Sequence, residues 1–311
     1  MTATKTYIGV EIGGTKLQLV RGRGTEIEEE LRYNIDASQG AGVIRQCILE
    51  GISKLKEEHK TAAIGVGFGG PVDWRTGTVQ VSHQVAGWDN FPLKQWLENE
   101  AQLPVVVDND ANTAAFAESL FGAGKEHRLV FYATLGSGVG GGYVIDKKIY
   151  HGAVPGEVEI GHVRLDKSGR TVESTCSGWA VNEKIRKLIQ KNDHCLLAAL
   201  SKQHTGAEAL LLKPALEQGD LMSKEILGAV ADDLAFAFSH IVHLFHPEVL
   251  VIGGGLSLLG NYLLDGIKQQ LPSYLMKAFH PGPIISVASL NEGVVPIGAL
   301  ALAKQLFDSK K

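Results

Sequence analysis

Three clusters of glycine follow apolar segments of the chain, and they constrain its fold more than any other feature. The clusters stand at residues 13–14, 136–142 and 253–255, each directly after a stretch typical of a buried β-strand. Glycine has no Cβ, so the backbone can turn tightly and its N–H groups can approach an anion. One such cluster alone is typical of a hairpin or a bulge. Three of them at strand ends make three unrelated hairpins or bulges a weaker interpretation.

Strand and helix signals alternate along the chain. A strand, a glycine turn and a returning strand occur at residues 7–21 and again at 129–146, which is a weak internal duplication. With 311 residues the chain is long enough for about two domains. We therefore expect an α/β fold of two similarly built domains with a ligand cleft between them. Strands are expected at 7–11, 16–21, 63–68, 105–107, 129–135, 143–146, 249–252 and 284–288, and helices at 42–59, 93–100, 111–121, 178–190, 206–217, 223–245, 261–270 and 296–307.

Composition argues against several classes of function. Thirty basic and 34 acidic residues give a net charge of −4, and no basic stripe with interleaved aromatics indicates nucleic-acid binding. No apolar run reaches the roughly 18 residues of a membrane helix, and residues 1–10 do not resemble a signal peptide. The three cysteines form no CxxC pair. We expect a cytoplasmic protein without a disulfide framework, a membrane partner or a nucleic-acid partner.

The two common glycine motifs of nucleotide-binding proteins do not fit this chain. The first cluster lacks the GxxxxGK[ST] spacing of a Walker A loop, and a strand follows it. The second matches the spacing GxGxxG, but it continues as the strand YVID, whereas a Rossmann motif continues as a helix. A different nucleotide-binding fold is needed.

Several segments, taken together and in order, resemble the sugar kinases of the ROK family, which belong to the actin/hexokinase-like superfamily. The resemblance covers nearly the whole chain. The matching segments are VEIGGTK at 10–16, GVGFGGPVD at 65–73, AGWDNFPL at 86–93, DNDANTAAFAE at 108–118, TLGSGVGGGYVIDKKIYHGA at 134–153, EIGH at 159–162 and PEVLVIGGGLS at 247–257.

The resemblance implies two ribonuclease H-like domains of the actin/hexokinase type, with a catalytic cleft between them. Residues 1–120 with the C-terminal helix 297–311 would form the smaller domain, and residues 121–296 the larger. The implied reaction is phosphorylation of a hexose at its 6-hydroxyl by ATP, with Mg²⁺ as cofactor and glucose as the first expectation. The family often forms dimers, so a homodimer is open, although no interface signature is present.

The resemblance also assigns the nucleotide site. Glu11 stands where the family often has Asp and would hold Mg²⁺ through water, as hard cations prefer oxygen ligands. A surface charge at a strand end is the alternative for Glu11. The residues expected to bind ATP are Gly13, Gly14, Thr15, Lys16, Gly136, Ser137, Gly138, Gly254 and Gly255.

Asp110 is the candidate catalytic base. Phosphoryl transfer needs positioning, charge neutralisation and a carboxylate that takes the hydroxyl proton. Asp110 follows an apolar strand and precedes a helix, where a helix N-cap is an equally good interpretation. The resemblance favours the base and leaves the cap to Asp108 or Asn112. The sugar contacts that it implies are Gly70, Gln84, Asn109, Asp110, Glu159, His162 and Glu173.

Two departures from the family pattern bear on the sugar site. The family usually follows the residue matching His162 with a cysteine hairpin that holds zinc. Cys176 is the one cysteine near His162, and a structural zinc site needs four ligands, so we expect no zinc. Gln84 stands where the family usually has Asn, and its extra methylene leaves the identity of the sugar open.

Three alternatives remain at this stage. The acceptor could be N-acetylmannosamine, mannose or fructose. The chain could be a non-catalytic sugar-binding regulator, since the family contains repressors, although about six residues before the first strand leave no room for a DNA-reading helix. A scaffold protein would leave the glycine loops unexplained.

Overall fold

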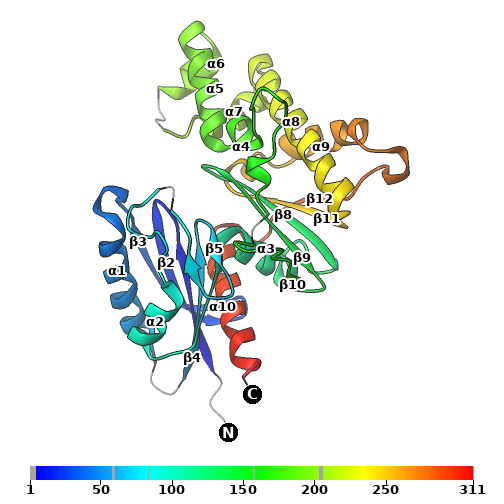
Figure 1. The fold of residues 1–311 in the computed structure, drawn as a ribbon. Helices are drawn as coiled ribbons and strands as arrows, with labels where there is room; N and C mark the ends of the chain where they lie inside the picture. The colour runs from blue at the N-terminus through cyan, green and yellow to red at the C-terminus, as the bar shows by residue number, and fades with distance from the viewer. Residues whose placement is uncertain (1–4, 58–59, 83, 157, 203–205, 311) are drawn as a thin grey trace. The chain divides into compact units, whose positions relative to one another are not determined.

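Two five-stranded sheets organise the chain, and each contains one of the two strand–glycine–strand repeats (Figure 1). The computed structural model describes residues 5–57, 60–82, 84–156, 158–202 and 206–310. The chain divides into two compact units. The first consists of Met1–Glu126, Gly142–Val158 and Leu290–Lys311, and the second of His127–Gly141 and Glu159–Ser289. The predicted α/β fold class is confirmed.

The first sheet has the strand order β3-β2-β1-β4-β7. Strands β1, β4 and β7 run parallel, and β2 and β3 are added to them as antiparallel strands. The sequence did not predict β3, because its acidic segment EIEEELRYN forms a largely exposed edge without a buried face. The strands of the first unit are β1 (Thr6–Ile12), β2 (Lys16–Arg23), β3 (Glu26–Asn34), β4 (Thr61–Phe68), β5 (Val72–Asp73), β6 (Thr78–Val79), β7 (Val105–Asn109) and β10 (Lys148–Ile149).

Helices cover both faces of this sheet (Figure 1). The helical segments of the first unit are η1 (Ala37–Gln39), α1 (Gly40–Leu55), α2 (Leu93–Ala101), α3 (Asp110–Phe121), η6 (Asn291–Gly293) and α10 (Val294–Asp308). Apolar residues of α1 and α2 fill one core with Ile8, Val10 and Ile64, while α10 packs on the opposite face. A Cβ on Gly65 would lie 1.9 Å from the Ala299 carbonyl oxygen, so α10 packs directly on the backbone of β4.

The second sheet has the strand order β10-β9-β8-β11-β12, with β8, β11 and β12 parallel. Strand β9 begins at Val139, so the glycine turn is shorter than the expected 136–142. The other strands are β8 (Leu129–Leu135), β9 (Val139–Ile145), β11 (Val249–Gly253) and β12 (Ile284–Val287). The helical segments are η2 (Ile160–His162), α4 (Val172–Cys176), α5 (Gly178–Lys191), α6 (Leu196–Ser201), η3 (Glu208–Leu211), α7 (Leu212–Glu217), α8 (Leu221–Phe245), η4 (Gly255–Leu259), α9 (Asn261–Tyr274) and η5 (Lys277–Phe279).

Helix α8 is the one helix among the described residues whose length and apolar composition would suffice to cross a membrane. Its most apolar window has a mean hydropathy of 1.3, but 56% of that window is buried inside the protein. The helix packs against α9 and α4. These contacts account for its apolar character as a core helix, and length and composition alone are weak evidence for a membrane span.

Candidate active site

In the first unit, the carboxyl ends of three neighbouring parallel strands gather the predicted residues. Strands β1 and β4 are followed directly by Gly13–Gly14 and Gly69–Gly70, and β7 ends at Asn109, directly before Asp110. The Gly69 N–H donates to the Ile12 carbonyl at 2.8 Å, which joins the first two strand ends. A Cβ on Gly69 would lie 3.4 Å from Asp110 Oδ2, so the candidate base lies beside these loops. This edge of a parallel sheet is where open α/β folds bind ligands.

Asn109 caps helix α3, which corrects the prediction that Asp108 or Asn112 would do so. Its Oδ1 accepts hydrogen bonds from the backbone N–H groups of Ala111 and Asn112, at 2.8 and 3.1 Å. Its Nδ2 donates to the Gly70 carbonyl at 3.1 Å and so ties the cap to the neighbouring loop. The backbone decides the cap, because Asn109 has the extended conformation of a capping residue.

Asp110 follows the capping residue and is the first residue of α3. Its side chain is half-buried, and its Oδ1 accepts from the Ala111 N–H at 2.8 Å. The N-terminal end of a helix carries partial positive charge, which stabilises a carboxylate there. The start of α3 therefore favours a carboxylate at the strand-end edge.

Asp108 and His151 lie behind this helix start, and the sequence analysis gave His151 no role. The buried Asp108 carboxylate accepts from the Asn109 N–H and from Asn112 Nδ2, at 2.8 and 3.0 Å. Its Oδ2 lies 2.6 Å from His151 Nε2. The His151 ring stacks on Trp74, with ring centroids 4.2 Å apart. No sequence motif could reveal this group, because 43 residues separate Asp108 from His151.

The first glycine loop carries an ion pair at its base. Lys16 Nζ lies 3.0 Å from Glu11 Oε2. Burial raises the pKa of Glu11 above its ordinary value, and the Lys16 ammonium opposes that rise. Gln84 approaches the same loop so closely that a Cβ on Gly14 would lie 1.3 Å from Gln84 Oε1. The exposed Thr15 completes the loop, and its carbonyl accepts from the Ile35 N–H at 2.9 Å.

Glu11 fits a magnesium ion that is held mainly by phosphate and water. Magnesium typically uses one or two carboxylates together with substrate phosphates. Glu11 has one carboxylate beside the glycine loop, and its buried Oε2 is the oxygen that pairs with Lys16, so a magnesium ion would share this carboxylate with the ammonium. Among the described residues, no group of three or more His, Cys, Asp or Glu side chains could form an all-protein metal site. A magnesium site here would therefore depend on the nucleotide.

In the second unit, the phosphate loop expected at Gly136, Ser137 and Gly138 follows strand β8. The Gly136 carbonyl accepts from the Gly178 N–H at 2.7 Å, at the start of α5. Gly254 lies at the end of the parallel strand β11 with a φ of 78°, a conformation that favours glycine. A Cβ on Gly254 would lie 2.5 Å from the carbonyl carbon of Leu135. Gly254 thus lies against the last residue of β8, directly before the phosphate loop.

Glu159 precedes the short helix η2, and His162 is its last residue. Glu159 is its N-cap residue, and Glu159 Oε2 lies 3.9 Å from His162 Nε2. Both side chains are exposed, by 46% and 71%. The backbone at Gly161 packs against Val139, where a Cβ would lie 2.2 Å from the carbonyl oxygen. The carboxylate and the imidazole can therefore act as a pair of acceptor and donor for hydroxyl groups.

Glu173 lies against the phosphate loop, which the sequence did not reveal. Its Oε2 accepts from the Val139 N–H at 2.9 Å. A Cβ on Gly138 would lie 2.5 Å from the same oxygen. The absence of a side chain at Gly138 therefore makes room for the Glu173 carboxylate.

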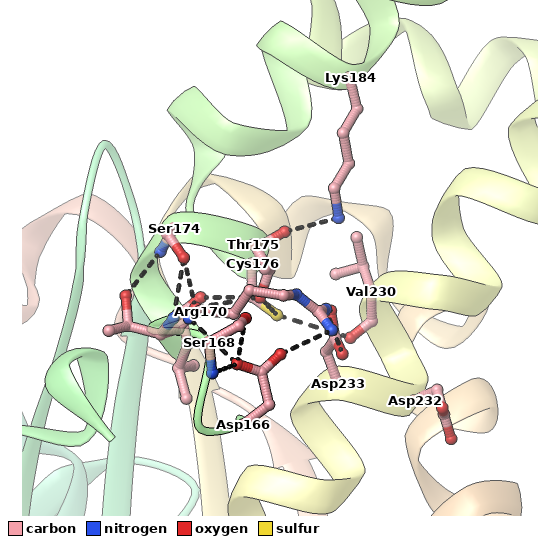
Figure 2. A network of polar contacts seen from close by, with 12 residues as sticks. Asp166, Ser168, Arg170, Ser174, Thr175, Cys176, Lys184, Val230, Asp232 and Asp233 are labelled. Atoms are coloured by element: carbon pink, nitrogen blue, oxygen red, sulfur yellow. Dashed lines mark hydrogen bonds and ion pairs between the residues drawn. The ribbon is translucent and has the colours of Figure 1, made fainter. Parts of the chain in front are cut away.

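The segment after His162 is held by a network of polar side chains (Figure 2). Asp166 accepts from the N–H and the hydroxyl of Ser168, at 2.7 and 2.5 Å. Arg170 donates to both carboxylate oxygens of Asp233 on α8, at 3.0 and 2.9 Å. Cys176 is buried beside Thr175, and burial raises the pKa of its thiol to about 11. These contacts are those of a hydrogen-bonded segment. The expected absence of zinc stays a prediction.

Comparisons with known proteins show similarity along nearly the whole chain. A sequence model described as the ROK family matches residues 7–306. A glucokinase from Halalkalibacterium halodurans is 32% identical over 317 residues, spanning 97% of this chain and 96% of that relative. A glucokinase from Thermotoga maritima is 30% identical over 308 residues, with 96% and 97% covered. A ROK family glucokinase from Streptomyces griseus, crystallised with glucose and AMPPNP, has a TM-score of 0.84 at 30% identity, covering 96% of this chain and 99% of that one.

Proposed function

The chain belongs to the ROK family, and we propose that it transfers a phosphoryl group from ATP to the 6-hydroxyl of a hexose, with glucose as the preferred acceptor. It is an ATP-dependent sugar phosphotransferase, as its glucokinase relatives and the glucokinase crystallised with glucose and AMPPNP support. Its fold is that of two actin/hexokinase-like domains. The identity of the acceptor and the roles of single residues are the proposal.

The observation that carries the proposal is the position of Asp110. It is the first residue of α3, at the edge where β1, β4 and β7 end, beside Gly69. A carboxylate at this edge can accept the proton of the attacking hydroxyl. We assign Asp110 as the catalytic base on this ground.

We assign the acceptor contacts to the polar groups nearest these loops. Asn109 and Gly70 are joined to each other by a hydrogen bond, and Gln84 lies over Gly14. In the second unit, Glu159 and His162 present a carboxylate and an imidazole to solvent. Sugar hydroxyls need hydrogen-bond donors and acceptors in fixed positions. The groups named in the first unit and the Glu159–His162 pair in the second both supply donors and acceptors.

The two glycine loops are assigned to the phosphates of ATP. Backbone N–H groups that face an anion cost no reorganisation when charge develops, so such loops bind the donor and stabilise the transition state. Lys16 adds a cation at the first loop, and Glu11 would hold magnesium there. When bound, that ion neutralises charge on the transferred phosphoryl group.

The closing test is turnover by the Asp110→Asn variant. ADP release is measured with Mg-ATP and glucose, mannose, fructose, N-acetylglucosamine or N-acetylmannosamine. We expect one sugar to be phosphorylated, and kcat of the variant to fall by about 10²–10⁴ while sugar affinity stays within several-fold, because only the proton acceptor is lost. The exposed Asp193→Asn is the matched control.

Each other outcome selects an alternative. Normal turnover by Asp110→Asn would remove the base assignment. A different preferred sugar would indicate that Gln84 has changed the specificity. Sugar binding without turnover in the wild-type protein would favour a regulator.

The cellular setting is proposed on fewer grounds. All three cysteines are free, which fits a reducing compartment such as the cytoplasm. We also propose that the protein forms a homodimer. Sedimentation at several protein concentrations measures the mass of the particle in solution and tests this.

A further inference from the structure

The start of α4 and the start of α5 both contact the second phosphate loop. Glu173 on α4 accepts from the N–H of Val139 at 2.9 Å, at the first residue of β9, directly after the loop. The Gly178 N–H, the first of α5, donates to the Gly136 carbonyl at 2.7 Å, at the first residue of the loop. The two contacts hold the loop at both ends.

Only one of these two contacts depends on a side chain. The Gly178 contact joins two backbone groups, so a side-chain change at position 173 leaves its donor and acceptor in place. The Val139 contact depends on the Glu173 carboxylate, which is charged and therefore a strong acceptor. Of the two contacts that hold the loop, the one from Glu173 is therefore the one that a bound ligand or a substitution at position 173 can change.

The carboxylate has a second oxygen. Glu173 Oε2 contacts the loop, whereas Oε1 has no hydrogen-bond partner among the described residues. One carboxylate can accept several hydrogen bonds. Oε1 can therefore accept a hydroxyl while Oε2 keeps its contact with the loop.

Helix α4 is fixed in place from its other side. Its first turn carries a capping box, in which Thr171 and Ser174 exchange hydrogen bonds between side chain and backbone. Arg170, immediately before it, is paired with Asp233 of α8 (Figure 2). Lys184 of α5 donates to the Thr175 carbonyl at 2.8 Å. Glu173 therefore projects from an anchored helix. A change in the position of its carboxylate would move the Val139 N–H that it contacts, and with it the loop.

We propose that Glu173 is a positioning residue that couples the acceptor to the phosphate loop. A hydroxyl bound to Oε1 immobilises the carboxylate and, through Oε2 and Val139, orders the loop of Gly136–Gly138 before the nucleotide arrives. Ordering a glycine-rich loop costs conformational entropy. When the acceptor has already ordered the loop, the nucleotide does not bear this cost and binds more tightly. This coupling rests on the proposed function, because it takes the acceptor to be a sugar.

The test is calorimetric titration with magnesium and AMPPNP, with and without saturating acceptor. In the wild-type protein, we expect the acceptor to lower the nucleotide Kd, and the nucleotide to lower the acceptor Kd by the same factor. In Glu173→Ala, the nucleotide Kd without sugar should rise about tenfold, because a charge-assisted hydrogen bond is lost. The acceptor should no longer change it.

Two further variants separate positioning from damage to the fold. Glu173→Gln keeps the side-chain length and one carbonyl oxygen for Val139, so its nucleotide Kd without sugar should stay within about threefold of wild type. Glu183→Gln is the matched control, because Glu183 is an exposed residue of α5 paired only with Lys187 among described residues. Its titrations should match those of the wild-type protein.

Three outcomes would overturn the inference. An unchanged nucleotide Kd in Glu173→Ala would mean that Glu173 does not hold the loop. If the nucleotide Kd of Glu173→Ala rises but the acceptor still lowers it by the wild-type factor, the coupling does not pass through Glu173. A wild-type protein that binds AMPPNP but no sugar contradicts the proposed function and the coupling together, while the nucleotide titrations alone still decide whether Glu173 holds the loop.

Discussion

The side chain of Asp108 links three parts of the first unit. It is buried, and its carboxylate contacts the backbone of Asn109, the amide of Asn112 and the ring of His151. A buried carboxylate is stable only when it is paired or hydrogen-bonded. The start of α3, which carries the proposed base Asp110, therefore depends on a histidine from the segment after β10.

We predict that His151→Gln lowers kcat about tenfold, with a smaller change in the KM for ATP. The variant removes the 2.6 Å contact to Asp108 Oδ2 and loosens the residues that orient Asp110. Steady-state kinetics with both substrates varied measures this. His194→Gln is the control, because the His194 side chain is 93% exposed. An unchanged kcat would show that the pair serves folding alone.

At the scale of elements, the helices of the second unit are joined by charged pairs as well as by apolar packing. Arg186 of α5 donates to both carboxylate oxygens of Glu208 in η3, at 2.7 and 2.9 Å. The hydrogen bonds from Arg186 hold the pKa of Glu208 below its ordinary value. The segment expected as one helix over 206–217 is split here into η3 and α7, and the ion pair fixes the first part.

This pair makes a pH-dependent contribution to stability. Because the folded pKa of Glu208 is lowered, the unfolded chain binds the proton more tightly. The contribution is complete above the ordinary carboxyl pKa of 4.5 and is lost as the pH falls through the lowered value. We predict that Glu208→Gln lowers the free energy of unfolding by about 1 kcal/mol at pH 7, and by less as the pH falls below 4.5.

Urea denaturation at a series of pH values measures this difference. Glu217→Gln, at the exposed end of α7, is the control and should follow the wild-type curve. A difference between Glu208→Gln and wild type that stays constant down to pH 3 would contradict an ionic origin.

At the scale of the whole molecule, the chain passes between its two units several times. The first unit is completed by Gly142–Val158 and by the C-terminal Leu290–Lys311. The buried carboxylate of Glu118 on α3 holds the segment at Leu290, where the chain enters the first unit for the last time. It accepts from the N–H of Leu290 at 2.8 Å and from that of Ala123 at 2.7 Å. The C-terminal helix α10 is thereby joined to the helix that carries Asp110.

We predict that Glu118→Gln lowers the free energy of unfolding by about 1–3 kcal/mol. The neutral amide cannot accept both backbone N–H groups as the carboxylate does, and a buried donor is left unsatisfied. Urea denaturation followed by circular dichroism measures the change. Glu225→Gln on the exposed side of α8 is the control. An unchanged midpoint would mean that other contacts hold the C-terminal segment.

The sequence by itself determined the family, the α/β class, most strands and helices, and the residues at the strand ends. These follow from local signals, because apolar periodicity and glycine clusters act over a few residues. The strand β3 and the short helix α4 were not predicted, since an acidic edge and a five-residue helix carry little periodicity. The domain boundaries and the roles of the site residues stay predictions.

Only the tertiary structure decided which partner each polar group has. Asn109, and neither Asp108 nor Asn112, caps α3, because the backbone angles at the strand end select the capping residue. His151 meets Asp108 across 43 residues, and Glu173 reaches Val139 across 34. Such contacts depend on how strands and helices pack, so no local pattern in the sequence encodes them. The glycine at position 138 was visible in the sequence, but the carboxylate that it accommodates was not.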